Sequence, residues 1–160
     1  MKILYICTHN RCRSILSEAI TNHVANGSII AKSAGSQPVG EVHPLSIKYL
    51  NEAGISTHGL HSQSWDEFED FAADVVVTVC DSAASETCPI WFGDSVKVHW
   101  GLADPSKLQG SEEQIADAFR TTIKEITLRV NKLMSLDTLR NNDCSNKETL
   151  RAELAGLGAL

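Results

Sequence analysis

The segment that determines the fold stands at the start of the chain, where residues 2–14 read KILYICTHNRCRS. Residues 2–7 are rich in β-branched and aromatic side chains, which predicts a buried strand. Residues 14–25 carry apolar side chains three and four positions apart, the spacing of an amphipathic helix. A strand that passes through a short loop directly into a helix is the opening unit of an α/β fold.

The rest of the sequence continues this alternation. Further strands are predicted over 28–33, 74–80 and 95–99, and helices over 44–53, 64–71 (a short helix capped by Ser64) and 111–136, with a long polar loop over 81–93. We therefore expect an α/β fold of three layers, in which helices flank a four-stranded, mainly parallel sheet. Residues 1–134 are predicted to form one catalytic domain. Residues 135–160 form a C-terminal helical tail without an assigned role, which we expect to be a weakly ordered surface helix.

Composition excludes several classes of protein. The chain has 160 residues, of which 42% are hydrophobic, so one domain with a real core is expected. The net charge of −6 argues against a general nucleic-acid binder, which needs a basic surface. No apolar run approaches the roughly 18–20 residues of a membrane span, and the first residues lack the pattern of a signal peptide. These features predict a cytoplasmic protein that binds neither nucleic acid nor membrane.

The loop between the first strand and helix has the features of an oxyanion site. Its backbone N–H groups and the helix N-terminus create a positive potential, and Arg13 can grip two anion oxygens. Cys7 at the start of the loop is expected to be a thiolate nucleophile, with Ser14 donating a hydrogen bond to its sulfur. The predicted anion-binding residues are Thr8, His9, Asn10, Arg11, Cys12, Arg13 and Ser14. The alternative is a buried cysteine at a strand end followed by an ordinary helix start.

Several motifs in order resemble one known family. They are the Cys7-x5-Arg13-Ser14 loop, SAGS at 33–36, VHP at 42–44, VTVCD at 77–81, CP at 88–89 and HWGLADP at 99–105. Together they resemble the low-molecular-weight protein tyrosine phosphatase superfamily, and within it the arsenate reductases. The resemblance covers about residues 1–133.

This resemblance implies a set of catalytic roles. Cys7 would attack arsenate held by Arg13, and Asp104 would act as general acid, because repulsion from a bound oxyanion favours its protonated form. Cys80 and Cys88 would complete a thiol–disulfide relay with Cys7. An external thiol reductant, either thioredoxin or glutathione with glutaredoxin, would restore the thiols. Phosphate and sulfate would compete with arsenate, and no bound cofactor or metal is expected.

Some alternatives stay open at this level. Seven residues separate Cys80 from Cys88, one more than in the thioredoxin-linked members, so a glutaredoxin route remains possible. A phosphatase would use Cys7, Arg13 and Asp104 in the same way but has no need of Cys80 and Cys88. A non-catalytic oxyanion-binding or redox-sensing module is the third reading. Asp104 can equally be a turn residue before Pro105.

Two supporting sets of residues are also considered. Asn10 and Ser33 match positions that order the loop through hydrogen bonds, while Glu18 is expected to face solvent or to brace the loop. Residues 62–64 read SQS without an aspartate, which argues against a potassium site. Cys12 is expected to pack as a small side chain, and Cys144 receives no role.

Overall fold

The computed structural model describes residues 1–86, 89, 92–136 and 146–160. The predicted relay residue Cys88 lies outside the described residues, as does Cys144.

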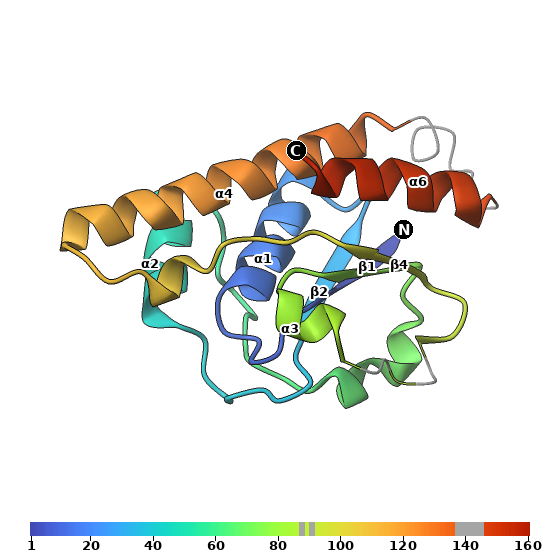
Figure 1. The fold of residues 1–160 in the computed structure, drawn as a ribbon, viewed down its shortest axis with the longest axis horizontal. Helices are drawn as coiled ribbons and strands as arrows, with labels where there is room; N and C mark the ends of the chain where they lie inside the picture. Colours follow the sequence, from blue (N-terminus) through green and yellow to red (C-terminus); the bar gives the residue numbers. More distant parts are fainter. Residues whose placement is uncertain (87–88, 90–91, 137–145) are drawn as a thin grey trace.

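The described strands form one parallel sheet in the order β2-β1-β3-β4 (Figure 1). They are β1 (Lys2–Ile6), β2 (Ile30–Ala34), β3 (Val75–Thr78) and β4 (Val96–His99). All three neighbouring pairs run parallel, with Ile6 opposite both Ala34 and Thr78. The predicted four-stranded α/β architecture is confirmed. The carboxyl ends of all four strands share one edge, where α/β proteins place their sites.

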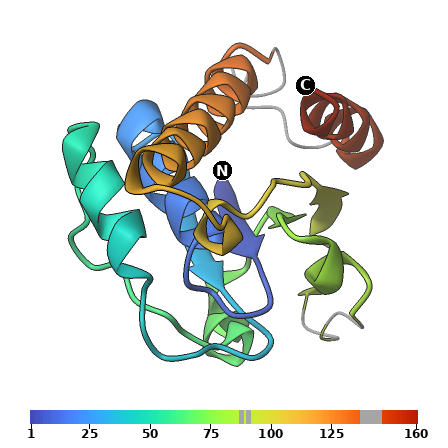
Figure 2. The same cartoon turned by 60° about the vertical axis from the view of Figure 1, so that its left-hand side comes forward.

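Helices cover this sheet and its edge. The α-helices are α1 (Arg13–Ala25), α2 (Pro44–Glu52), α3 (Asp81–Ala84), α4 (Glu112–Met134) and α6 (Lys147–Gly158), and the 3₁₀ helices are η1 (Trp65–Phe71) and η3 (Pro105–Lys107). Helix α1 packs on β1 and β2, and α4 packs across α1 (Figure 2). No helix in the described ranges is long and apolar enough to cross a membrane.

The core follows from the side chains of the central strands. Ile3, Leu4, Tyr5 and Ile6 of β1 are all buried because this strand has neighbours on both sides and helices above it. Helix α4 begins at a capping box in which Ser111 and Gln114 bond each other's backbone N–H groups. The helix then packs against α1, α2 and α6.

Two local expectations are wrong. The segment predicted as a polar loop over 81–93 begins with a helix, α3, because the Cys80 sulfur accepts a hydrogen bond from the Ala83 N–H and caps that turn. The C-terminal helix is not a loose surface element either. Leu150, Leu154 and Leu157 of α6 are buried against β4 and α4, which leucines at a helical spacing achieve by facing one side.

Candidate active site

The sheet edge brings Cys7, Arg13, Cys80 and Asp104 to one cavity of about 150 Å³, while the predicted anion-binding residues Asn10 and Ser14 are buried and do not line it. Cys7 follows β1, Cys80 follows β3, and Asp104 lies beyond β4, so the parallel topology joins segments far apart in the sequence. The cavity is lined by Cys7, Thr8, His9, Arg11, Cys12, Arg13, Cys80, Ser82, Asp104, Ser106 and Lys107.

Asn10 organises the loop from within. Its backbone is left-handed, with φ of 47°, and its side chain is fully buried. The Asn10 Nδ2 group donates to Ser14 Oγ at 2.8 Å and to Ser33 Oγ at 3.0 Å, and its Oδ1 accepts from the Gln63 N–H at 2.9 Å. One amide therefore ties the loop to α1, β2 and the segment before η1, in agreement with the predicted ordering role.

The same network continues to Glu18 in α1. Ser33 Oγ donates to Glu18 Oε2 at 2.7 Å, and Glu18 is only 4% exposed. Burial raises the pKa of this carboxyl group to about 7. Of the two predicted placements, Glu18 braces the loop and does not face solvent. The Ser14 hydroxyl accepts a hydrogen bond from Asn10 Nδ2, and its donation to the Cys7 sulfur stays a prediction.

Gly35 explains the SAGS motif that ends β2. A Cβ at this position would lie 2.5 Å from the Thr8 carbonyl oxygen and 3.0 Å from that of Cys7. Only glycine therefore lets the end of β2 pass directly against the loop. This requirement was not recognised in the sequence.

Arg13 lines the cavity, and part of its guanidinium is held by protein acceptors. Its Nη1 donates to the Leu102 carbonyl at 3.1 Å, and its Nη2 lies 3.4 Å from Asp104 Oδ2. Among the described residues its buried Nε has no hydrogen-bond partner. The Asp104 carboxylate also accepts hydrogen bonds from the N–H and hydroxyl of Ser106. The guanidinium is thus oriented from behind, and its Nε–H is free to bind an anion oxygen.

Cys7 and Cys80 form a hydrogen-bonded pair of sulfurs at the floor of the cavity. The hydrogen bond from Cys7 lowers the pKa of Cys80 to about 5, and the same bond together with burial raises the pKa of Cys7, although Arg13 acts in the opposite direction. The pair therefore retains one proton near neutral pH. The neighbouring Cys80 sulfur is therefore a second influence on the Cys7 thiol, beside the loop and Arg13.

Thr8 connects this pair to a residue that the sequence analysis missed. Its Oγ1 lies 3.7 Å from Cys80 Sγ and donates to Glu86 Oε1 at 3.1 Å. On the other side of α3, His99 lies 3.0 Å from Asp81 Oδ1 and 2.8 Å from Thr78 Oγ1. These side-chain contacts attach the Cys80 segment to its surroundings. Only the closeness of Glu86 to Cys80 in the sequence could have suggested that Glu86 contacts the Cys7 loop through Thr8.

The other loop residues fall into two groups. His9 and Arg11 are exposed at the mouth of the cavity, near Lys107. Cys12 is buried, and burial raises its pKa to about 11, so it remains a packed thiol as expected. Within the described ranges no three His, Cys, Asp or Glu side chains lie close enough together to hold a metal ion.

The comparisons with known proteins agree with this geometry. The family model described as low molecular weight phosphotyrosine protein phosphatase matches residues 2–146. The chain belongs to this family. The resemblance of its motifs to this superfamily is thereby confirmed.

Curated relatives and solved structures place the chain near one branch. An arsenate reductase of Halalkalibacterium halodurans is 34% identical over 128 residues, which are 80% of this chain and 91% of that protein. A glutaredoxin arsenate reductase of Synechocystis is 28% identical and covers 84% of this chain and 96% of that protein.

Two solved arsenate reductases superpose well. One, in a phosphate-binding state, has a TM-score of 0.69 at 28% identity, and the match covers 84% of this chain and 96% of that chain. A thioredoxin-dependent arsenate reductase of Corynebacterium glutamicum has a TM-score of 0.67 at 25% identity; the match covers 89% of this chain and 63% of that chain.

Proposed function

We propose that the protein reduces arsenate to arsenite, using Cys7 as nucleophile and Cys80 as the second electron-donating thiol. One observation carries this proposal: the Cys7 and Cys80 sulfurs share a hydrogen bond beside Arg13 and Asp104 in one cavity. A phosphatase needs Cys7, Arg13 and Asp104, but only a redox reaction needs a second thiol within reach of Cys7.

Anion binding would use the loop and Arg13. Arsenate oxygens accept from the loop N–H groups and from the guanidinium, and phosphate and sulfate compete because they have a similar shape and charge. The anion takes over donors that Asp104 holds in the empty site. Repulsion between the two then favours protonated Asp104.

The first chemical step would join arsenic to Cys7. Cys7 Sγ attacks the arsenic atom while the proton that the two sulfurs share moves to Cys80. Asp104 donates its proton to the departing oxygen, which leaves as water. The product is a Cys7 thiolate–arsenate adduct, in which arsenic is still As(V).

The second step would reduce arsenic. Cys80 Sγ attacks Cys7 Sγ and forms the Cys7–Cys80 disulfide, and the electron pair of the S–As bond leaves with arsenic as As(III). The Cys80 proton passes to the departing arsenite. Cys88 would then attack Cys80, release Cys7 and leave a Cys80–Cys88 disulfide for the external reductant. Two thiols are oxidised for each arsenate reduced.

The electron donor we propose is thioredoxin, which reduces exposed disulfides of this kind directly. The thioredoxin-dependent enzyme of Corynebacterium glutamicum supports this choice, while the Synechocystis glutaredoxin arsenate reductase supports the glutathione and glutaredoxin route. The two routes differ in their need for Cys88, because glutathione can attack the adduct or the disulfide itself.

The test is arsenite formation by purified protein, with thioredoxin and its reductase or with glutathione and glutaredoxin in separate assays. Cys7→Ser, Cys80→Ser and Cys88→Ser are compared with Cys144→Ser, a cysteine outside the relay. Thioredoxin-driven turnover that only the first three substitutions abolish supports the whole proposal. Turnover with glutaredoxin alone and a dispensable Cys88 supports arsenate reduction but rejects the relay.

A second outcome of the same test is hydrolysis. If neither system yields arsenite while p-nitrophenyl phosphate is hydrolysed rapidly, the protein is a phosphatase. The residues after Asp104 argue against that outcome, because Ser106 and Lys107 stand where the phosphatases carry an aromatic residue that stacks on tyrosine.

A further inference from the structure

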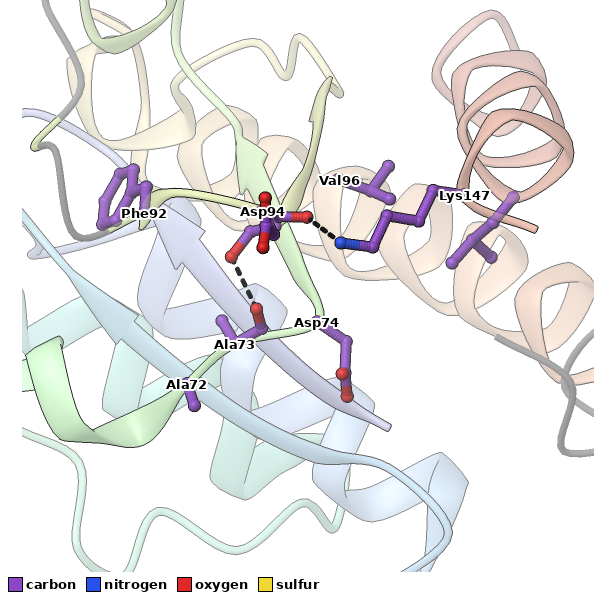
Figure 3. A pocket seen from close by; sticks show the side chains of 9 residues that line it. Ala72, Ala73, Asp74, Phe92, Asp94, Val96 and Lys147 are labelled. Carbon is purple, nitrogen blue, oxygen red and sulfur yellow. Dashed lines mark hydrogen bonds between the residues drawn. The ribbon is translucent and has the colours of Figure 1, made fainter. Parts of the chain in front are cut away.

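The C-terminal helix α6 is attached to the segment that carries the proposed general acid. Helix α6 lies along β4, the edge strand of the sheet, and beside α4 (Figures 1 and 2). Figure 3 shows its first residue, Lys147, reaching the loop before β4, where Nζ donates to the Asp94 carbonyl at 2.8 Å. Further along α6, contacts with the end of β4 and with the residue that follows it are made by Leu154 and Gly158.

Trp100 is the central attachment. Its Nε1–H donates to the Leu154 carbonyl of α6 at 2.8 Å, and the side chain is 2% exposed. The buried Trp100 N–H therefore depends on α6 for its acceptor, and leaving this donor without a partner would be costly. At the end of α6, a Cβ on Gly158 would lie 2.6 Å from the His99 carbonyl oxygen, so the two backbones are in direct contact.

Arg129 of α4 joins the same two elements. This cation is 5% exposed, and its Nη1 donates to the Gly101 carbonyl at 3.5 Å. Its Nη2 donates to the carbonyls of Gly158 and Leu160 at 3.4 and 3.3 Å. A buried guanidinium therefore holds the end of α6 and the residue after Trp100 in one arrangement.

The other end of this short segment enters the active site. The Leu102 carbonyl accepts from Arg13 Nη1, and Asp104, two residues later, lies against Nη2. The Leu102 N–H donates to the Val79 carbonyl, next to Cys80. Three residues thus separate Trp100 from Asp104, and hydrogen bonds to the Gly101 carbonyl and to both backbone groups of Leu102 leave them little freedom.

We infer that α6, acting through Trp100 and Arg129, positions Asp104 for proton donation and Arg13 for anion binding. Trp100 and Arg129 are positioning residues, since neither touches the cavity. This inference rests on the proposed role of Asp104 as general acid. It assigns a function in the reaction to a helix that begins where the family match ends, at residue 146.

The test uses the dependence of rate on the leaving group. Hydrolysis of phenyl phosphate needs a proton from the acid more than hydrolysis of p-nitrophenyl phosphate, whose leaving group is stable as an anion. Trp100→Phe and Arg129→Gln are compared with Asp104→Asn and with Ile29→Ala, a core truncation at the β2 side of the sheet. All are assayed at a temperature at which melting curves show every variant folded.

A positioning role predicts a selective loss. Asp104→Asn lowers kcat for phenyl phosphate by about 100-fold or more, and Trp100→Phe by about tenfold, as expected for a displaced acid. Both substitutions lower kcat for p-nitrophenyl phosphate much less, and Arg129→Gln changes the two rates in the same direction. The kcat for arsenate reduction falls in the same order, while Ile29→Ala lowers only the melting temperature.

Two results would overturn this inference in distinguishable ways. If Asp104→Asn shows the selective loss and both α6-linked variants keep the wild-type ratio of the two rates and the wild-type kcat for arsenate, α6 serves stability alone. If Asp104→Asn itself leaves both the ratio and arsenate turnover unchanged, the proposed general acid is wrong and the positioning role falls with it. Should Trp100→Phe fail to fold, Arg129→Gln and Arg129→Lys decide the question.

Discussion

The two cysteine-bearing segments of the site are held in different ways. The loop of Cys7 is fastened from inside by the buried Asn10 amide and by backbone contacts with β2, including the close passage of Gly35. The segment after Cys80 is a four-residue helix in which only Ala83 is buried, and side chains such as Asp81 and Glu86 attach it from the surface. An anion cradle requires fixed donors, whereas a thiol that must reach two partners requires a segment that rearranges at low cost.

The largest expected effect concerns the fixed side of this comparison. Arg13→Lys keeps the charge but loses the planar fork, so kcat/KM for arsenate should fall by about 100- to 1,000-fold. Steady-state kinetics measures this, with Arg120→Lys on the surface of α4 as the control that stays at wild-type rates. A loss below about tenfold would mean that Arg13 does not clamp the anion, given this magnitude for one lost donor.

The next effect isolates the network that holds the loop. Asn10→Ala leaves the Gln63 N–H and two buried hydroxyl groups without their partner, and unfolding should become easier by roughly 2–4 kcal/mol. The matched control is Asn26→Ala at the exposed end of α1, where the backbone has the same left-handed φ of 47° but no buried network. It should cost about 1 kcal/mol. Equal costs in urea titrations would show that the backbone conformation alone matters.

A pH-dependent effect tests the buried end of that network. The pKa of Glu18 is raised from 4.5 to about 7, so between these values the folded state binds more protons than the unfolded state. Stability should therefore fall by roughly 3 kcal/mol as the pH rises from about 4.5 through 7. Glu18→Gln still accepts from Ser33 and should lose this dependence, becoming more stable than the wild type at pH 8 but not at pH 4.

The control for Glu18 is Glu113→Gln, an exposed carboxylate in the first turn of α4. Its stability curve should run parallel to that of the wild type across the whole pH range. Thermal unfolding at half-unit steps of pH provides the data. A Glu18→Gln curve that is also parallel would mean that the carboxyl group ionises in the folded and unfolded states alike.

The smallest effect probes the lightly held segment. Asp81→Asn and Glu86→Gln each weaken one surface attachment of α3, worth about 0.5–1 kcal/mol. Opening of the segment, and with it alkylation of Cys80 by iodoacetamide, should rise about two- to fivefold at nearly unchanged stability. Glu69→Gln, on the surface of η1, should leave the rate unchanged. Equal alkylation rates in all variants would mean that the two segments are equally fixed.

Much of the site was readable in the sequence because it depends on local order along the chain. The strand–loop–helix succession over residues 2–25 predicts both the sheet and the anion loop, and Asn10 was correctly expected to order it. The surroundings of Ser14 and of the Cys7 sulfur, by contrast, depend on neighbours that only the fold supplies. The Ser14 hydroxyl accepts a hydrogen bond from Asn10, and the Cys80 sulfur helps to raise the pKa of Cys7.

The C-terminal helix shows the same limit. Its leucine spacing predicts a helix with one apolar face, but a periodic pattern does not say which surface covers that face. The structure places α6 on β4 and brings Trp100, Arg129 and Gly158 together from three elements. The hydrogen bond that caps α3 with the Cys80 sulfur is likewise invisible to a reading of residue types.

The sequence by itself determined the parallel α/β fold and the position of the loop from Cys7 to Arg13, because spacing and hydrophobic pattern act between residues near in the chain. The role of Asp104 was implied only by the family resemblance. Only the tertiary structure decided that Cys80 lies beside Cys7, what raises the pKa of Glu18, and that Asp104 lies against Arg13. Those properties arise from burial and from contacts between residues up to about ninety positions apart, such as Arg13 and Asp104. The packing of the folded chain determines both the burial and these long-range contacts, and no local sequence pattern encodes either.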